Sequence, residues 1–489
     1  MRLSTLASRA GMALPDGSDA QVTGFAIDHR KVAPGTVFGA FVGTQVNGES
    51  YIPAAVAAGA VAVVARSEAS VAGAIHIADA VPRRAFAQLA AGFFTPVPAT
   101  VVAVTGTNGK TSCAELTRQL WRMLGERAAS IGTLGVTTAD ESISTGLTTP
   151  DIVTFLANMS GLAREGVTHV AYEASSHGLS QYRNEGLKVQ AGAFTNLSRD
   201  HLDYHADMDD YFAAKMRLFD EVVDGAGTAV VWADDEWSDK AFEHVRQRGL
   251  RLLSVGEKAD RTINGSSIRL LARSPGQLGQ VLSVEFADTA YTIKLPLIGA
   301  YQAANALVSA GLAIATGSDP ARVFDALSRL QPVRGRLERA AISRAGAPIY
   351  VDYAHTPDAL AAAIAALRPH LAGRLIVVLG AGGDRDAGKR PEMGRIVAEQ
   401  ADLGLVTDDN PRSEDPAAIR AAIIAGGLGK LHDGGERRAA IAAAIAGAGA
   451  EDIVLIAGKG HEQGQIIGAG AAMRVQPFDD VSVARECAA

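Results

Sequence analysis

The chain has 489 residues, about three times the ~150 residues that serve as a prior for one domain, so a single-domain protein is not expected. Hydrophobic residues make up 48% and charged residues 20% of the chain, which is ordinary for folded protein and excludes disordered and fibrous classes. The net charge of −7 gives no overall positive field, so neither nucleic acid nor anionic lipid is an expected partner.

The cysteine content and the lengths of the apolar runs indicate the cellular compartment of the protein. Cys113 and Cys487 are too few for a disulfide framework, which indicates a reducing environment. The longest apolar stretch, 51–65, contains Pro53 and Gly59 and is shorter than the ~20 residues that span a bilayer. The N-terminus has no apolar run of the signal-peptide kind. We therefore predict a cytoplasmic protein without a membrane partner.

From about residue 100 onward, apolar runs rich in Val and Ile alternate with Ala- and Leu-rich stretches of helical period. This pattern is typical of buried parallel strands joined by crossover helices, and it predicts an α/β fold. Most of the strands run directly into a turn with Gly, Asp or His, and ligands of such sheets bind at these carboxyl ends. The clearest strands are expected at 101–104, 169–172, 229–232, 349–351, 375–379 and 453–456.

Two seams divide the chain. Pro96 and Pro98 favour an extended linker, because the residue before a proline is pushed out of helical conformation. The second seam follows Pro332. We expect an N-terminal α/β domain at 1–96, a central ATPase-like domain with a mostly parallel sheet at 97–332, and a Rossmann-like C-terminal domain at 333–489.

A strand at 101–105 enters a glycine-rich loop that is followed by a helix. In such a loop the backbone N–H groups surround phosphate oxygens, Lys110 supplies a point charge and the Thr111 hydroxyl can bind Mg²⁺. The loop is shorter than the common GxxxxGK[ST] form, since Val104 stands where its first glycine would be. A glycine turn with an exposed lysine is the weaker alternative. The expected ATP contacts are Gly106, Thr107, Asn108, Gly109, Lys110, Thr111 and Ser112.

Glu173 directly follows the strand at 169–172. A carboxylate at this place could hold Mg²⁺ as a Walker-B residue does. The equally weighted alternative is a helix cap, in which Ser175 or Ser176 bonds to backbone N–H groups.

A second candidate for metal binding is the segment 200–205, with two histidines and two aspartates. His201 and His205 stand at positions i and i+4, which is one arrangement of a zinc site. No glutamate lies between them as a general base, and the ATP loop upstream favours Mg²⁺. Zinc hydrolysis is therefore the weaker interpretation.

Six short motifs occur in order along the three expected domains. They are GTNGKT at 106–111, TTP at 148–150, EASSHG at 173–178, NLSRDHLD at 196–203, YAHTPD at 353–358 and GKGHE at 458–462. Together they resemble the Mur ligase family, ATP-dependent enzymes that add amino acids to the cell-wall precursor peptide. Chance agreement of six ordered motifs is negligible.

The resemblance implies a carbamylated lysine, and Lys215 fits its position. An ammonium repels Mg²⁺, whereas a carbamate presents an oxygen anion suited to a hard cation. Thr111 and Glu173 would then hold one Mg²⁺, while His201 and the modified Lys215 hold or position another. Without the resemblance, a surface lysine on an amphipathic helix is the preferred interpretation.

The family also implies three further ATP contacts: an asparagine after a glycine turn, an arginine at the domain seam and an aspartate on the next strand. Asn305, Arg336 and Asp352 fit these places. Gln302 is a mild departure, because relatives often carry asparagine there. By themselves, all three would be interpreted as caps or surface residues.

The N-terminal segment resembles the UDP-binding domain of ligases that add the third peptide residue. It departs from them at His29, where a small hydroxyl residue is usual, and at Asn47, where the family has aspartate. These departures affect the uracil contacts and not the reaction. The contacts expected here are His29, Thr44, Gln45 and Val46.

The choice of amino acid is expected to depend on the motif Asp409, Asn410, Pro411 and Arg412, which resembles that of ligases adding meso-2,6-diaminopimelate. Diaminopimelate has a second carboxylate that lysine lacks, and a guanidinium can clamp a carboxylate with two charge-assisted bonds. Arg385, Gly458 and Glu462 would hold the amino-acid end, with Glu462 near the ammonium. A glycine turn at 380–383 mimics a dinucleotide fingerprint but lacks its spacing, so NAD is not expected.

The reaction implied by the resemblance joins meso-2,6-diaminopimelate to UDP-N-acetylmuramoyl-L-alanyl-D-glutamate through an acyl phosphate, with ATP and Mg²⁺. Because both partners of the first step are anions, Mg²⁺ and Lys110 must neutralise their charge. Closure about 334–336 is expected, since ATP and the amino acid lie on different domains. We expect a monomer. The muramoyl peptide would contact Thr148, Thr149, Ser175, Gln181 and Arg183.

Three alternatives stay open at this point. The first is the same reaction with L-lysine. The second is a folylpolyglutamate synthase, which shares the GTNGKT loop but lacks an N-terminal UDP-binding domain. The third, from a different class, is an ATP-dependent switch that makes no amide bond and has no use for Lys215, Arg385 and Arg412 together.

Overall fold

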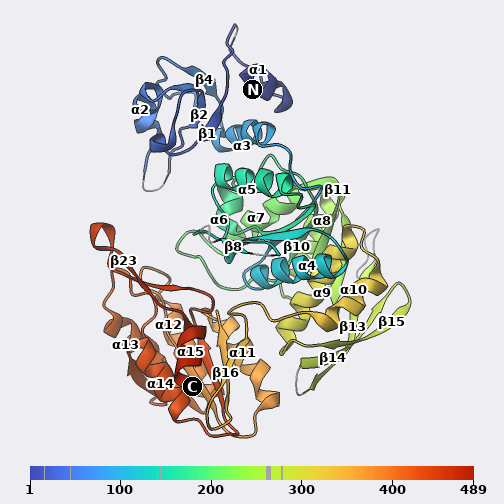
Figure 1. Cartoon of the computed structure of the whole chain (residues 1–489), viewed down its shortest axis with the longest axis vertical. Coiled ribbons are helices and arrows are strands. Elements are labelled where there is room, and N and C mark those ends of the chain that lie inside the picture. Colours follow the sequence, from blue (N-terminus) through green and yellow to red (C-terminus); the bar gives the residue numbers. More distant parts are fainter. Residues whose placement is uncertain (16, 44–45, 140, 144–145, 260–265, 277–278) are drawn as a thin grey trace.

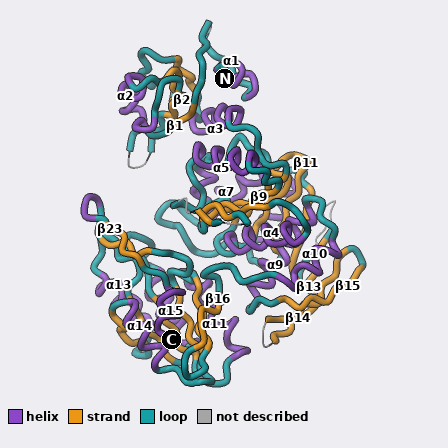
Figure 2. Tube along the Cα trace, viewed as in Figure 1, coloured by secondary structure: helices purple, strands orange, loops and turns teal. Residues whose placement is uncertain are grey.

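The computed structural model describes residues 1–489 except 16, 44–45, 140, 144–145, 260–265 and 277–278. Three α/β units follow one another along the molecule, each with its own sheet (Figure 1). Figure 2 shows the strands of these units as separate groups, with helices around each. The predicted α/β fold with mostly parallel sheets is confirmed. Within the described ranges, no helix is long and apolar enough to cross a membrane.

The first sheet has four parallel strands in the order β1-β2-β3-β4. Phe86 of helix α3 packs edge-on against Phe25 of β1 with ring centroids 5.4 Å apart, and α3 also contacts α5 of the next unit. Helix α3 therefore joins the first unit to the second. The elements are α1 (Leu3–Arg9), β1 (Gly24–Ala26), β2 (Thr36–Gly39), α2 (Ile52–Ala57), β3 (Ala60–Ala65), β4 (Ile75–Ala78) and α3 (Pro82–Phe93).

The central sheet has eleven strands in the order β15-β14-β13-β12-β11-β10-β5-β9-β6-β7-β8. Its middle, from β13 to β6, is parallel, and antiparallel hairpins extend both ends. The strands are β5 (Thr100–Thr105), β6 (Ala128–Gly132), β7 (Gly135–Thr137), β8 (Ser142–Ile143), β9 (His169–Glu173), β10 (Val189–Phe194), β11 (Val223–Trp232), β12 (Arg251–Gly256), β13 (Ser267–Gly276), β14 (Gly279–Phe286) and β15 (Thr289–Leu295).

Both faces of this sheet are buried. Along β5, Val101 and Ala103 face the core under α5, α7 and α8, whereas Val102 and Val104 face the core under α4 and α9. Burial on both faces explains why the strand is an unbroken apolar run. The helices are α4 (Lys110–Met123), α5 (Ile152–Arg164), α6 (Ser176–Ser180), α7 (Met208–Arg217), α8 (Ser238–Gln247), α9 (Ala300–Ala315) and α10 (Pro320–Ala326).

The third sheet has six strands in the order β16-β17-β21-β18-β19-β20, and only β16 is antiparallel to its neighbour. A separate hairpin, β22 (Gly464–Ile467) and β23 (Arg474–Pro477), follows it. The other elements are β16 (Glu338–Ile342), β17 (Pro348–Asp352), α11 (Pro357–Leu367), β18 (Leu375–Leu379), α12 (Lys389–Gln400), β19 (Leu403–Thr407), α13 (Pro416–Gly426), β20 (Leu431–Gly435), α14 (Arg437–Ala446), β21 (Ile453–Ala457) and α15 (Asp480–Ala488).

All six strands expected from the apolar runs are present, so those predictions are confirmed. The observed strands extend by up to a few residues beyond most of the predicted ranges, because flanking polar residues such as Thr105 and Glu173 still pair in the ladder. The sheets span 24–78, 100–295 and 338–457, and the proposed domain boundaries fall between them.

Candidate active site

The phosphate loop lies between β5 and α4, as expected from the sequence. Lys110 Nζ donates to the carbonyls of Gly106 (2.9 Å) and Thr107 (2.8 Å), so the ammonium is already held over the loop. Gly109 has φ 89°, and a Cβ there would lie 2.5 Å from Asn305 Oδ1, so only glycine fits. No side chain caps the N-terminus of α4, which leaves its first N–H groups available for phosphate oxygens.

Residues that directly follow β10 form hydrogen bonds with the backbone of the phosphate loop. The N–H of Thr107 donates to the Asn196 carbonyl (2.9 Å), and the N–H of Asn108 donates to Asn196 Oδ1 (2.8 Å). Thr195 Oγ1 donates to the Asn108 carbonyl (2.6 Å). The first half of the NLSRDHLD motif therefore shapes the phosphate loop.

Glu173 is a buried carboxylate, 2% exposed, at the end of β9. It accepts hydrogen bonds from Thr111 Oγ1 (3.0 Å) and from the N–H and hydroxyl of Thr133 (2.6 and 3.1 Å). Ser175 Oγ accepts from the N–H of Gly178 (3.0 Å) and caps α6. The helix cap is thus formed by Ser175, which leaves the Glu173 carboxylate outside the cap; its role in binding Mg²⁺ stays a prediction.

Lys215 is buried, with 1% exposure, and the interpretation of it as a surface lysine is wrong. Its Nζ donates to the Gly106 carbonyl (2.7 Å) and lies 4.2 Å from the ring centroid of Tyr211. Burial lowers the pKa of Lys215 well below its usual value, and the nearby charge of Lys110 lowers it further.

His201 lies beside Asp200, with Nε2 3.5 Å from Oδ2 of the carboxylate. Burial lowers the pKa of His201 to about 3, so its imidazole is neutral. Nδ1 of His205 is 3.1 Å from Asp210 Oδ2. Across the part of the chain that the structure describes, no three His, Cys, Asp or Glu side chains are grouped to hold a metal, so the zinc alternative has no ligand set.

The three further ATP candidates lie near the loop. Arg336 Nη2 donates to Thr111 Oγ1 (2.9 Å), and its Nη1 is buried without a hydrogen-bond partner among the described residues, so a phosphate oxygen would satisfy it. Asp352 accepts from the N–H groups of Leu337 (2.6 Å) and Ala354 (2.8 Å), and burial raises its pKa to about 6. Gln302, the departure noted in the sequence, donates to the Arg336 carbonyl (2.9 Å).

These side chains surround one cavity of about 560 Å³. Its wall is made by the central unit and by the first residues of the third unit. The sequence-predicted residues that line it are Thr107, Asn108, Gly109, Lys110, Thr111, Ser112, Thr148, Glu173, Ser175, His201, Lys215, Asn305, Arg336 and Asp352.

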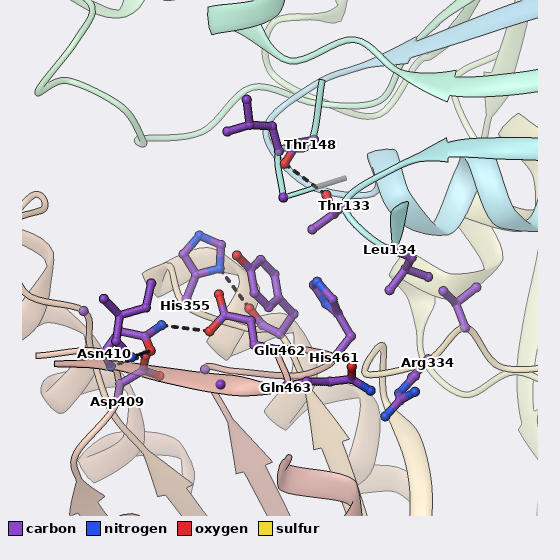
Figure 3. A pocket seen from close by; sticks show the side chains of 18 of the residues that line it. Thr133, Leu134, Thr148, Arg334, His355, Asp409, Asn410, His461, Glu462 and Gln463 are labelled. Atoms are coloured by element: carbon purple, nitrogen blue, oxygen red, sulfur yellow. Dashed lines mark hydrogen bonds between the residues drawn. The ribbon is translucent and has the colours of Figure 1, made fainter. Parts of the chain in front are cut away.

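A second cavity, of about 1170 Å³, lies between the central unit and the carboxyl ends of β17, β18, β19 and β21 (Figure 3). The sequence-predicted residues that line it are Thr148, His201, Arg385, Asp409, Asn410, Arg412, Gly458 and Glu462. Pro411 is buried and is not among the lining residues. The two cavities share a wall made of six residues: Thr133, Thr148, Asp200, His201, Tyr353 and His355.

Two arginines of the second cavity are free to take a carboxylate. Arg412 Nη1 donates to the Gly383 carbonyl (2.8 Å), and within the described ranges neither Arg412 nor Arg385 forms an ion pair. Arg412 has φ 51°, in the left-handed region, which turns the loop after β19 toward the cavity. An unpaired guanidinium in a cavity fits a ligand with a carboxylate.

The residues predicted for the muramoyl peptide form one polar network beside Glu173. Thr149 Oγ1 donates to the Glu173 carbonyl (2.8 Å) and to Ser175 Oγ (3.0 Å). Arg183 donates to the Thr149 carbonyl (2.8 Å) and to Gln181 Oε1 (2.6 Å).

His29 and Val46, two of the N-terminal candidates, lie on the first unit and line neither cavity. The ring of His29 stacks on Tyr51, with centroids 4.3 Å apart and an angle of 6°. Val46 is 56% exposed. Thr44 and Gln45 lie outside the described residues.

The phosphate loop lies on one α/β unit, and its cavity shares a wall with a charged cavity on the next unit. This arrangement fits the class of nucleotide-dependent ligases that are built from several domains. The chain belongs to the Mur ligase family. Family models match at residues 21–93 (Mur ligase family, catalytic domain), 104–313 (Mur ligase middle domain) and 335–460 (Mur ligase, glutamate ligase domain).

Two relatives and one solved structure carry the same name, UDP-N-acetylmuramoyl-L-alanyl-D-glutamate--2,6-diaminopimelate ligase. The relative from Zymomonas mobilis subsp. mobilis is 58% identical over 99% of this chain and 98% of its own. The relative from Bradyrhizobium diazoefficiens is 52% identical over 98% and 97%. The solved structure is 31% identical, with a TM-score of 0.70, and covers 99% of this chain and 98% of its own.

Proposed function

We propose that this chain uses ATP to join meso-2,6-diaminopimelate to UDP-N-acetylmuramoyl-L-alanyl-D-glutamate in peptidoglycan precursor synthesis. The observation that carries the proposal is that the phosphate cavity shares a wall with a cavity lined by Arg385 and Arg412, which form no ion pair among the described residues. The similarity to ligases of this name supports the substrates. In this proposal, 1–96 binds the UDP end, 97–332 binds ATP and 333–489 binds the amino acid.

In the first step, the side-chain carboxylate of the D-glutamyl residue attacks the γ-phosphorus of ATP. A bond from carboxylate oxygen to phosphorus forms, the bond to the β–γ bridging oxygen breaks, and ADP leaves. Both reactants are anions, so cations must offset their repulsion. Lys110 and Arg336 both face the phosphate cavity, and Arg336 Nη1 has no other partner among the described residues.

The residues at the loop also fit a hard cation. Thr111 supplies a hydroxyl and Glu173 a carboxylate 3.0 Å from it, both on the cavity wall, and oxygen ligands of this kind suit Mg²⁺. A bound Mg²⁺ would offset phosphate charge, held by Thr111, Glu173, His201 and Lys215.

Lys215 contributes through modification. Burial lowers the pKa of Lys215, which favours its unprotonated amine; that amine attacks CO₂, so that an N–C bond forms, one proton is released and the side chain becomes an anionic carbamate. We expect Lys215→Arg to lower phosphate release by about 10²-fold or more, because a guanidinium cannot form this anion and one ligand of the cation is lost. Initial rates at saturating bicarbonate measure the loss.

A second readout is ¹³C NMR of protein equilibrated with ¹³C-bicarbonate. The natural chain is expected to give a carbamate signal that Lys215→Arg lacks. Lys240→Arg is the matched control, because Lys240 is an exposed lysine, 58% accessible, paired with Asp209. Full activity of Lys215→Arg would contradict the role.

In the second step, the free amine of the amino acid attacks the acyl carbon. The amide C–N bond forms, the C–O bond to phosphate breaks and inorganic phosphate leaves. Glu462, with its side chain 31% exposed, faces the ammonium end, while Arg385 and Arg412 hold the carboxylates.

The proposal is tested by phosphate release with the muramoyl dipeptide, ATP and Mg²⁺, and each amino acid in turn. Diaminopimelate is expected to support turnover, and lysine to be worse by ~10⁴-fold, because it leaves an arginine unpaired. A folylpolyglutamate synthase would instead need a folate acceptor and glutamate, and a switch would be indifferent to every amino acid. Either result, or equal use of lysine, contradicts the proposal.

A further inference from the structure

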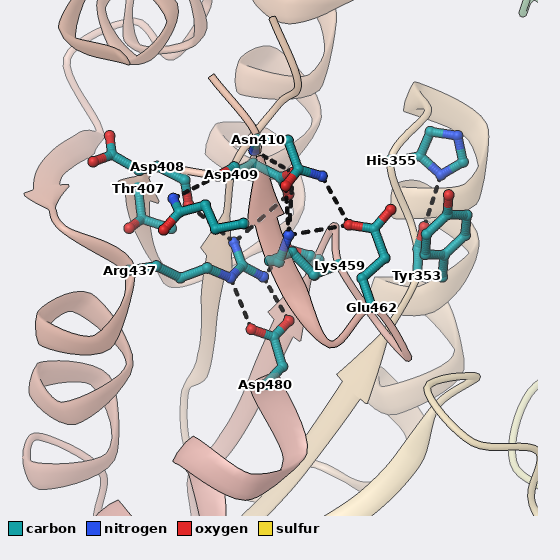
Figure 4. A network of polar contacts seen from close by, with 12 residues as sticks. Tyr353, His355, Thr407, Asp408, Asp409, Asn410, Arg437, Lys459, Glu462 and Asp480 are labelled. Carbon is teal, nitrogen blue, oxygen red and sulfur yellow. Dashed lines mark hydrogen bonds and ion pairs between the residues drawn. The ribbon is translucent and has the colours of Figure 1, made fainter. Parts of the chain in front are cut away.

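Beneath the second cavity lies a cluster of polar and charged side chains, most of them buried, that includes two residues outside every sequence motif, Arg437 and Asp480 (Figure 4). We call it the buried charge cluster. Lys459, Arg437 and Asp480 are each fully buried. The other members come from the predicted amino-acid site, and the complete set is Asp409, Asn410, Arg437, Lys459, Glu462 and Asp480.

Lys459 holds one oxygen of Glu462. Its Nζ donates to Glu462 Oε2 (3.0 Å) and to Asn410 Oδ1 (2.9 Å). Asn410 Nδ2 donates to the same Glu462 Oε2 (2.8 Å). Within the described ranges no hydrogen bond reaches Oε1, which leaves that oxygen for a ligand in the cavity that Glu462 lines.

Arg437 and Asp480 form a buried ion pair that contacts the end of β21 and the loop after β19. Arg437 donates to both Asp480 oxygens (2.8 and 2.7 Å) and to the Ala457 carbonyl at the end of β21 (3.0 Å). Its Nη1 lies 3.9 Å from Asp409 Oδ2, on the loop after β19. The pair thus connects the two loops that carry the predicted amino-acid contacts.

The charges of the cluster do not cancel. Three carboxylates, Asp409, Glu462 and Asp480, face two cations, so one negative charge is in excess. Asp480 is matched by Arg437 in a bidentate pair, and Glu462 is the carboxylate with the largest exposure, 31%. The excess negative charge therefore lies beside the cavity that Asp409 and Glu462 both line, and it suits one ammonium group entering from the cavity.

We propose that Lys459 is a positioning residue for the amino-acid substrate. It does not reach the substrate, since it is fully buried. It fixes the Glu462 carboxylate and the Asn410 amide, so that Glu462 Oε1 meets the ammonium of the incoming amino acid. This inference rests on the proposed function, in that the second cavity takes an amino acid.

The test is Lys459→Met in the full chain. The KM for diaminopimelate is expected to rise by about tenfold or more, because Glu462 loses a charged donor and is free to turn. The KM for ATP is expected to stay within about twofold, since no cluster residue lines the phosphate cavity. Arg438→Met is the control, because Arg438 neighbours Arg437 but forms only an exposed pair with Glu486.

A double-mutant cycle separates positioning from simple structural support. Glu462→Gln alone is expected to raise the KM for diaminopimelate, and adding Lys459→Met to it should add less than about twofold, because the carboxylate that Lys459 holds is gone. The inference would be overturned if the rises in KM for diaminopimelate caused by Glu462→Gln and Lys459→Met simply multiplied in the double mutant. It would also be overturned if Lys459→Met raised the KM for ATP as much as the KM for diaminopimelate. Lys459→Gln, which keeps an N–H donor without the charge, should give a smaller rise and provides the readout if Lys459→Met does not fold.

The natural chain separates the two proposals. If it uses no diaminopimelate in the same assay, the proposed function fails and the inference fails with it. If the natural chain turns over normally and Lys459→Met and Lys459→Gln leave its KM for diaminopimelate unchanged, only the role of Lys459 is refuted.

Discussion

Replacing Lys110 by methionine is expected to slow phosphate release by about 10³-fold, the largest effect of any single change in the phosphate loop. The ammonium is held over the loop by the carbonyls of Gly106 and Thr107, so it is in place before ATP binds. Methionine keeps the length of the side chain and removes the charge that offsets developing negative charge on the phosphates. Initial rates at saturating substrates measure the change.

Two comparisons make this result specific. Lys294→Met changes an exposed lysine of β15 and is expected to leave the rate unaltered. The melting temperature of Lys110→Met should stay close to that of the natural chain, because Lys110 forms no ion pair within the described ranges. A rate within tenfold of the natural chain would show that the loop does not act on the transferred phosphate.

Arg412→Ala should lower kcat/KM for diaminopimelate by about 10²–10³-fold, the range expected when one partner of a buried charge-assisted pair is removed. The guanidinium lines the second cavity and, among the described residues, donates only to the Gly383 carbonyl, so it can clamp the second carboxylate of the substrate. The KM for ATP should change by less than about threefold. The ratio of kcat/KM for diaminopimelate to kcat/KM for lysine should also fall in Arg412→Ala.

Arg395→Ala is the matched control, since Arg395 lies on helix α12 in an exposed i, i+4 pair with Glu399. Its expected effect on both substrates is negligible. Should Arg412→Ala lose the same factor for ATP as for diaminopimelate, the arginine would be acting on the fold of the third unit and not on the choice of amino acid.

The fold could be predicted from the sequence to a large extent because buried parallel strands are apolar on both faces. The run from Val101 to Val104 divides its side chains between two cores, so alternation is absent and the run is easy to find. Short strands of the first sheet, such as β1 and β4, lack such runs and were not located in advance. Sheet order was also out of reach, because it depends on packing between distant segments.

The candidate site could be predicted where polar residues follow a strand, as at Lys110, Glu173 and Asp352. The burial of Lys215 could not, because its contact with Gly106 spans 109 positions and requires β10 and β5 to be neighbours. A helix pattern alone places this lysine at the surface. The family resemblance pointed to it, and the structure supplies the physical reason.

Other members of the site gave no usable signal. Thr133 is a single threonine after β6, yet it donates twice to Glu173. Arg437 and Asp480 are 43 positions apart and pair only because α14 and α15 pack together. Lys459 lay within a recognised motif, but only the coordinates reveal that its charge is turned inward, away from the cavity.

The wall shared by the two cavities has a consequence for inhibition. Because Thr133, His201 and His355 border both spaces, a single compound that reaches past these side chains would contact both cavities. A tetrahedral phosphorus group tethered to a diamino diacid would engage both halves while losing overall translational freedom only once. Such a tethered molecule should bind far more tightly than either fragment, and a compound confined to one half could not reproduce that gain.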